Sequence, residues 1–201
     1  MRYATGVAIA ILLAGCQSSG STWVAINSQD QFTDSTTKIV TVGSLPSHGT
    51  LFTQSMHYYP FVGIQNDEIY VGLRSGGRYP LPTGTVQLRI DNNKSWTITT
   101  DETPIYLMPA SPAIPQGIAV PGMDMSKFQT QMMQTVAKAA SPYTATTGAK
   151  AKSILKEMTT GKKVIYRTVG INQAASTTGE VAIDSSFIES LRKIGIDPNK
   201  L

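Results

Sequence analysis

The chain has a single cysteine, Cys16, so no disulfide within it can hold a fold together. Many small secreted domains depend on such bonds. This chain of 201 residues must instead be stabilised by packing, and it is long enough to bury a substantial core. One cysteine also excludes thiolate zinc sites and iron–sulfur clusters, because both need several thiolates.

The N-terminus combines a positive charge at Arg2, an apolar run over residues 7–14 and small residues just before Cys16. This order is typical of a secretory signal peptide. The apolar run is too short to cross a bilayer, which takes roughly 20 residues. The tetrapeptide Leu-Ala-Gly-Cys that ends at Cys16 resembles the cleavage site of bacterial lipoproteins. The alternative is an ordinary signal peptide with a chance cysteine.

The resemblance implies that residues 1–15 are removed and that Cys16 carries a diacylglycerol, usually with a third acyl chain on its amine. Each buried methylene contributes about 0.8 kcal/mol, so two or three chains would anchor the protein firmly. Gln17, where an aspartate would imply retention in the inner membrane, implies the outer membrane, facing the periplasm or the cell surface.

The expected organisation is a lipoprotein signal peptide over 1–15, a lipidated tether over 16–22 and a single globular domain over 23–201. Hydrophobic residues make up 41% of the chain and charged residues 15%, which suits a globular domain. The net charge of +4 is small and the basic residues are scattered along the chain, so no nucleic-acid partner is predicted. Basic residues are more frequent over 138–163. They would suit either helix faces exposed to solvent or a surface that binds anionic lipid headgroups.

Residues 23–108 carry mostly strand signals. The clearest pair is 85–90 and 95–99, where apolar and polar residues alternate on either side of a turn at 91–94. This pattern predicts a β-hairpin with one buried and one solvated face. Strands are expected at 38–42, 69–73, 85–90, 95–99 and 105–108, and proline- and glycine-rich loops at 75–84 and 109–122.

After Gly122 the apolar period becomes helical. Ser126 with Gln129, and Ser186 with Glu189, fit capping boxes. Helices are expected at about 126–140, 149–159 and 186–194, a strand at 164–169 and a loop at 170–179. The order of elements predicts an α+β fold, with an antiparallel sheet or sandwich in the N-terminal half and C-terminal helices packed on it.

Histidine is the usual general base, and the chain has His48 in an expected turn and His57 at an expected strand edge. Neither lies in a hydrolase or zinc motif. An envelope hydrolase that uses His57 or His48 as its base is one alternative function. The adjacent acids Asp67–Glu68 and Asp101–Glu102 are interpreted as solvated turns.

The methionines suggest a second alternative, a small-ligand or metal carrier, because thioethers suit Cu(I). Met132 and Met133 fall on the apolar stripe of the first helix, where core packing explains them more simply. We therefore predict neither a metal site nor a cofactor. The other methionines considered are Met56, next to His57, and Met123 and Met125.

Aromatic residues are frequent in the strand-rich half. If some are exposed beside arginines, they would form a binding patch of the tyrosine and arginine type found at interface hot spots. The candidate binding residues are Arg74, Arg78, Tyr79, Tyr58 and Tyr59.

Residues 71–73, 88–91, 154–161 and 163–166 are similar to pieces of periplasmic proteins of the invasion-associated locus B type. The resemblance implies a β-rich fold and a small accessory protein for envelope stress or host interaction. The anchor, together with the absence of catalytic motifs, favours a membrane-anchored cell-envelope lipoprotein with a non-enzymatic binding, assembly or accessory role. Its expected partners are the membrane, through lipid on Cys16, and an envelope protein.

Overall fold

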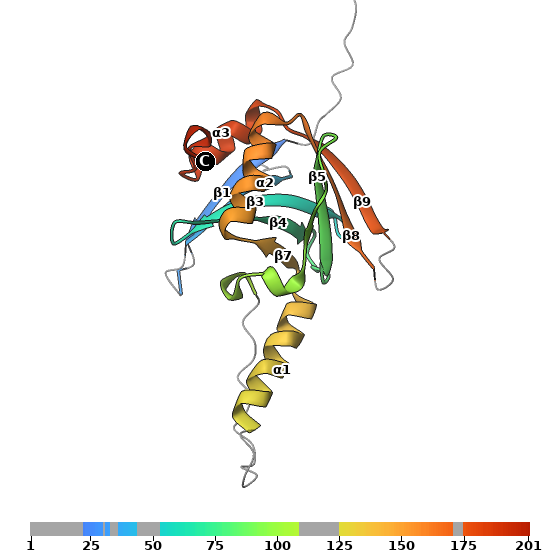
Figure 1. Cartoon of the computed structure of the whole chain (residues 1–201). Helices are drawn as coiled ribbons and strands as arrows, with labels where there is room; N and C mark the ends of the chain where they lie inside the picture. Colours follow the sequence, from blue (N-terminus) through green and yellow to red (C-terminus); the bar gives the residue numbers. More distant parts are fainter. Residues whose placement is uncertain (1–21, 30, 33–35, 44–52, 109–124, 171–174) are drawn as a thin grey trace, which may run out of the picture.

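The computed structural model describes residues 22–29, 31–32, 36–43, 53–108, 125–170 and 175–201 (Figure 1). The strands in this part of the chain are β1 (Trp23–Gln29), β2 (Thr36–Val42), β3 (Tyr58–Gln65), β4 (Glu68–Ser75), β5 (Thr85–Ile90), β6 (Trp96–Ile98), β7 (Tyr143–Thr146), β8 (Lys163–Val169) and β9 (Ala175–Ala182). The helices are α1 (Met125–Ala140), α2 (Gly148–Thr160) and α3 (Ser185–Lys193), with short 3₁₀ helices η1 (Thr100–Glu102), η2 (Ile105–Leu107) and η3 (Pro198–Lys200).

The strands form two antiparallel sheets. One has the order β1-β2-β3-β4-β7 and the other β6-β5-β8-β9. The predicted hairpin is present as β5 and β6, with Leu88 opposite Trp96 and Val86 opposite Ile98. The α+β fold class is therefore confirmed, with most strands in the N-terminal half and the helices in the C-terminal half.

The main core lies between the two sheets, and α2 and α3 complete it. Leu73 of β4, Leu88 of β5 and Leu155 of α2 are at most 1% exposed. Trp23 joins distant parts of this core, because its indole Nε1 donates to the Ala182 carbonyl at 2.7 Å and its own carbonyl accepts from the Ser190 hydroxyl at 3.1 Å. The first residue of β1 is therefore hydrogen-bonded to both β9 and α3.

A smaller cluster covers the other face of the five-stranded sheet, with Phe61 and Tyr70 buried in edge-to-face contact. Tyr70 lies opposite Gly63, and any side chain at Gly63 would collide with the tyrosine ring. Gly63, which has no side chain, thus leaves the space that the Tyr70 ring occupies across the strands. Burial raises the pKa of the Tyr70 hydroxyl well above its ordinary value, so the residue stays neutral.

Strand β7 was not predicted from the sequence. It follows α1 and pairs with β4, so that Gly72 lies opposite Ala145. A Cβ atom at Gly72 would collide with the Thr144 backbone, which shows how closely the two strands approach. The pairing inserts a segment of the helical half into the N-terminal sheet.

Three local predictions are wrong. The strand expected at 105–108 is η2, which starts after Pro104 and whose Leu107 N–H donates to the Pro104 carbonyl. The loop expected at 170–179 contains the first part of β9, because β8 pairs with it. The third helix is capped by Asp184, which accepts from the Ser186 N–H at 2.9 Å, and so begins before the predicted cap.

The first two predicted helices are confirmed as α1 and α2, but only α2 is packed as expected. On α1, Met132 is 58% and Val136 57% exposed, so the expected core packing of this stripe is wrong. The cap side chains of α1, the loop at 109–122 and Met123 lie outside what the structure describes. None of the helices in the described residues is both long and apolar enough to span a bilayer.

Candidate functional site

The outer face of the four-stranded sheet carries the residues that alternate with its buried ones. In β5 the apolar Val86, Leu88 and Ile90 point into the core, so the residues between them face outward. The register of β8 and β9 continues the same outward row. The outward residues are Thr97 on β6, Thr85, Gln87 and Arg89 on β5, Lys163, Ile165, Arg167 and Val169 on β8, and Thr178 and Glu180 on β9.

The turn between β5 and β6 holds Arg89 in place. Its Nε donates to the Asn93 carbonyl at 2.9 Å and its Nη2 to the Asn92 carbonyl at 3.2 Å. The turn itself is fixed by Asp91, which has a positive φ of 49° and accepts the backbone N–H groups of Lys162 and Lys163 at 3.0 Å. Arg89 is therefore bound to a turn that α2 and β8 support.

A second arginine is held by a row of side chains across three strands. Arg167 Nε donates to Gln87 Oε1 at 2.7 Å, and Gln87 Nε2 donates to Thr97 Oγ1 at 3.1 Å. The three residues lie side by side in the register of β8, β5 and β6. This row uses Nε of Arg167, and no other side chain among the described residues bonds its terminal amino groups.

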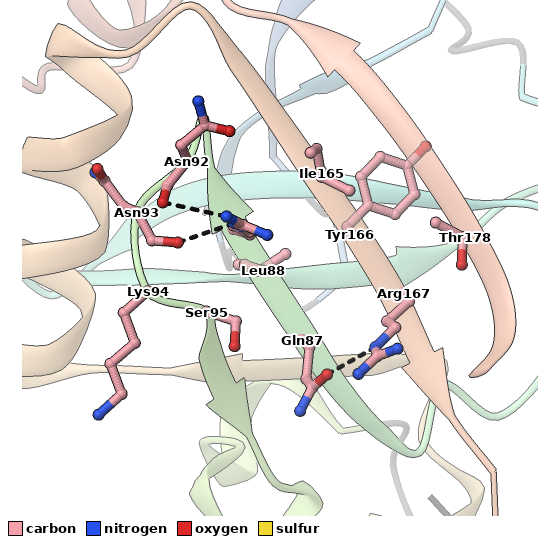
Figure 2. Close-up of a pocket in the computed structure, with 11 residues that line it drawn as sticks. Gln87, Leu88, Asn92, Asn93, Lys94, Ser95, Ile165, Tyr166, Arg167 and Thr178 are labelled. Atoms are coloured by element: carbon pink, nitrogen blue, oxygen red, sulfur yellow. Dashed lines mark hydrogen bonds between the residues drawn. The ribbon is translucent and has the colours of Figure 1, made fainter. Parts of the chain in front are cut away.

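The two arginines border a surface hollow of about 520 Å³ (Figure 2). Arg89 and Arg167 are diagonal neighbours on adjacent strands, a relation that places residues about 7–8 Å apart. Lys94 lies at the rim, and in Figure 2 its chain extends away from the sheet. The lining is completed by Gln87, Leu88, Asn92, Asn93, Ser95, Ile165, Tyr166 and Thr178.

The residues that line this hollow are positive or neutral, although Glu157 accepts from the Asn93 side chain at 3.0 Å just outside it. Its lining contains no carboxylate. On the same face Glu180 is paired with Lys163 at 3.0 Å, in a neighbouring hollow. Burial raises the pKa of Tyr166 to about 12, with the nearby Tyr59 adding to the effect, so this phenol carries no charge at neutral pH. The geometry suits an anionic group.

A second hollow of about 590 Å³ adjoins the first and shares Gln87 and Arg167 with it. Its lining adds the hydroxyls of Thr85, Thr97 and Thr99. The face therefore has Arg89 and Arg167 around the first hollow, and Arg167 together with hydroxyl and amide groups around the second. An extended ligand with both charged and polar groups would match this order.

The predicted tyrosine and arginine patch is brought only partly together. Arg74 has Tyr59 as its cross-strand neighbour on β3, and Tyr58 lies at the same strand end. Arg78 and Tyr79 lie in the loop after β4, with the Arg78 guanidinium 6.0 Å from the Tyr79 ring centroid and Tyr79 74% exposed. Neither group lines the two hollows described above.

Arg74 is the least satisfied member of that patch. Its Nε is buried and has no hydrogen-bond partner, and its Nη2 reaches Thr53 Oγ1 only at 3.5 Å. Burial lowers the pKa of Arg74, opposed by the neighbouring Tyr143 and Tyr59. Tyr58 is already engaged, since its hydroxyl donates to the Pro82 carbonyl at 3.1 Å.

Of the two histidines considered as a catalytic base, only His57 lies in the described part of the chain. His57 is exposed, and its ring is 3.0 Å from the Ser55 carbonyl. Among the described residues, neither a hydroxyl nor a carboxylate side chain is bonded to this ring. Among the residues described, no three His, Cys, Asp or Glu side chains are grouped to hold a metal ion. His48 and Cys16 lie outside the described part of the chain.

Asp67 and Glu68 are exposed at the turn between β3 and β4, as predicted, but the prediction of a solvated turn is wrong for Glu102. Glu102 binds Lys150 at 2.7 Å and accepts from Thr146 at 2.8 Å, whereas Asp101 is 87% exposed at its side chain. Burial alone would raise the pKa of Glu102, but hydrogen bonds from Lys150, the Thr99 amide and Thr146 outweigh it and lower the pKa. Glu102 is thus a structural clamp.

Sequence reasoning missed Gln87, Arg89 and Arg167 as site residues. The alternation in 85–90 and 164–169 already predicted that these side chains would be solvated. It could not show that β5 and β8 are neighbours, which lie far apart in the sequence. No family model, curated protein or solved structure matches the chain. What the protein does must therefore follow from its own residues.

Proposed function

We propose that this chain is a lipid-anchored protein of the bacterial cell envelope that binds an anionic glycan without chemical conversion. The anchor is diacylglycerol on Cys16, and Gln17 favours the outer membrane. The ligand surface is the outer face of the four-stranded sheet. The similarity to proteins of the invasion-associated locus B type stays a prediction, and the proposal does not depend on it.

The observation that carries the binding role is the pair of fixed arginines, Arg89 and Arg167, around a hollow without carboxylates. Both guanidinium groups are pre-positioned by hydrogen bonds, so little side-chain entropy is lost when a ligand binds. Arginine also matches phosphate and carboxylate oxygens in geometry. The ligand would therefore carry phosphate or carboxylate groups.

The choice of a glycan over other anions rests on the adjoining hollow. Its hydroxyl and amide groups, on Gln87, Thr85 and Thr97, match the hydroxyls of a sugar chain. The outward residues of this face include no aromatic ring on which a nucleic-acid base could stack. A polymer that alternates hydroxyl and acidic groups fits both hollows together.

The binding test uses polygalacturonate, which carries carboxylates, a phosphorylated mannan and neutral dextran. We expect the full chain with Cys16→Ser to bind one or both acidic polymers and not dextran, with an affinity that falls as salt rises. Arg167→Gln should weaken binding about tenfold through loss of charge-assisted hydrogen bonds. Arg192→Gln, at the exposed end of α3, is the matched control for charge. Equal losses in both variants, or equal binding of dextran, would disprove the site.

The anchor is tested separately. Intact-mass spectrometry of the chain from a bacterial membrane fraction should show residues 1–15 removed and a diacylglycerol on Cys16. A Cys16→Ser variant should leave the membrane fraction. A product with a free thiol at Cys16 would refute the anchor and leave the glycan site untouched.

A further inference from the structure

The two arginines of the first hollow are held in different directions. Arg89 donates to the carbonyls of Asn92 and Asn93, which lie in the turn beyond the end of β5. Arg167 donates to Gln87, which lies two residues before Arg89 on β5 (Figure 2). One guanidinium is therefore held toward the turn, and the other is held toward the middle of β5.

Each arginine keeps one edge of its guanidinium for a ligand. Both side chains use Nε for bonds within the protein, and Arg89 also uses one N–H of Nη2. Among the described residues, no other group bonds Nη1 of Arg89 or the terminal nitrogens of Arg167. The edge formed by Nη1 and Nη2 can donate two parallel hydrogen bonds to one carboxylate or phosphate. Each arginine can thus hold one acid group.

Both arginines also keep their full positive charge. Their partners are two backbone carbonyls and the Gln87 amide, which are neutral groups. Neither arginine takes part in an ion pair within the described part of the chain. Each charge is therefore available to an acid group of its own on a ligand.

The two arginines are also offset along the sheet. Arg89 lies opposite Ile165 and Arg167 lies opposite Gln87, which is an offset of two residues. Two residues of a strand span about 7 Å, and neighbouring strands lie about 4.8 Å apart. A single carboxylate or phosphate is small beside this offset, and the hydrogen bonds hold the two side chains away from a common point.

We propose that the first hollow recognises two separate acid groups of one ligand, one at Arg89 and the other at Arg167. This inference rests on the proposed glycan site and defines its ligand more narrowly. The ligand is an oligomer in which acid groups recur along the chain. A sugar with a single acid group, or a free phosphate ion, would occupy only one of the two arginines.

The surroundings of the two arginines indicate how such an oligomer continues. Beyond Arg167, the second hollow reaches Thr85 and has no carboxylate in its lining. Beyond the turn, the neighbouring hollow contains the carboxylates of Asp91 and Glu180 together with two lysines. An acidic chain is therefore favoured along β5, from Arg89 past Arg167 toward Thr85.

Binding at two points has a distinct effect on affinity. Once Arg167 holds one acid group, a second group of the same oligomer meets Arg89 at a high effective concentration. Charge-assisted hydrogen bonds at the second arginine then raise the affinity by about tenfold or more. If only one arginine bound the ligand, extra acid groups would raise the affinity merely in proportion to their number.

The test is calorimetric titration of the full chain with Cys16→Ser against two series of oligomers. One series is galacturonate with its dimer, trimer and tetramer, and the other is mannose oligomers that carry one to four phosphates. In at least one series the affinity should rise by about tenfold or more once the oligomer reaches both arginines. Arg89→Gln and Arg167→Gln should each remove this step. Arg192→Gln, on α3, should keep it, and the fully methyl-esterified galacturonate tetramer should not bind.

An affinity that rises only in proportion to the number of acid groups, or a step that survives in either arginine variant, would overturn recognition at two points. No binding of any oligomer would overturn it as well, because both arginines line a single hollow. Either result leaves the glycan site standing if the acidic polymers still bind in a way that depends on Arg167. Far-UV circular dichroism checks that each variant is folded.

Discussion

Helices α1 and α2 have similar lengths and similar amphipathic sequences, yet they are used differently. α2 buries Ala151, Ile154, Leu155 and Met158 in the main core. In α1, none of the residues whose side chains are described is buried. The comparison teaches that an apolar stripe predicts a helix but does not say what covers the stripe. In α2 the domain covers the stripe, whereas in α1 Met132 and Val136 are exposed.

The two acids of η1 repeat this contrast on a smaller scale. Glu102 joins η1 to α2 through Lys150, with both side chains only about a third exposed, at 29% and 31%. Asp101 joins η1 to α1 through Lys138, and its own side chain is 87% exposed. Solvent weakens the second pair much more than the first. The link to α2 is structural, and the link to α1 is loose.

The largest expected difference between the helices is in hydrogen exchange. Amides of α2 should open only with global unfolding, which costs about 5–15 kcal/mol in ordinary domains. Amides of α1 before its last turn should open at a cost of about 0–2 kcal/mol. Exchange followed by mass spectrometry would measure this. Equal protection of the α1 and α2 amides from exchange would contradict the expected difference in stability between the two helices.

Core substitutions should give the next largest difference. Leu155→Ala should lower the free energy of unfolding by about 2–5 kcal/mol, because it leaves a cavity at a fully buried position. Met132→Ala, at an exposed position on α1, should change it by no more than about 0.5 kcal/mol. Urea denaturation of both variants measures the two changes. A large loss from Met132→Ala would mean that α1 packs on the body in solution.

Substitutions of the two acids of η1 should differ less in their effect on the free energy of unfolding. Glu102→Gln should lower the free energy of unfolding at neutral pH by about 1–2 kcal/mol, after allowance for solvent screening, because Lys150 and Thr146 lose a charged acceptor. Asp101→Asn should change it by at most about 0.5 kcal/mol. Thermal unfolding of both variants at neutral pH makes the comparison.

The pH dependence of the unfolding free energy distinguishes Glu102 further from Asp101. The pKa of Glu102 is lowered in the folded state from the ordinary 4.5. Its stabilising effect is therefore fully present above that ordinary value and is lost as pH falls through the lowered one. The stability difference between wild type and Glu102→Gln should shrink below about pH 4. A difference that stays constant down to acid pH would contradict the assigned clamp.

Local sequence patterns predicted much of the fold. Alternation in 85–90 and 95–99 predicted the β5–β6 hairpin, and helical periodicity predicted α1 and α2. The failures share a physical cause. β7 has four residues and forms because β4 offers it a partner, and the first part of β9 is rich in small polar residues but pairs with β8. Pairing with a distant strand overrode weak local preferences there.

The candidate site was predicted to a smaller extent. Sequence reasoning grouped Arg74 and Tyr59 in one candidate patch. The structure makes them cross-strand neighbours and buries the Arg74 Nε, which the sequence did not predict. Sequence reasoning passed over Arg89 and Arg167, because nothing in either local pattern links them. Their proximity depends on the β5–β8 register, which unites residues about eighty positions apart, as Gln87 and Arg167 are.

By itself the sequence determined which residues are apolar, where Gly and Pro favour turns, and which segments with a clear period, such as β5, β6 and α2, become strands or helices. These properties depend on neighbours a few positions away, so they can be recognised along the chain. Only the tertiary structure decided which strands pair, which helix face is covered and which cations share a hollow. Those outcomes depend on contacts between distant segments, where burial and register in the assembled fold outweigh local preference.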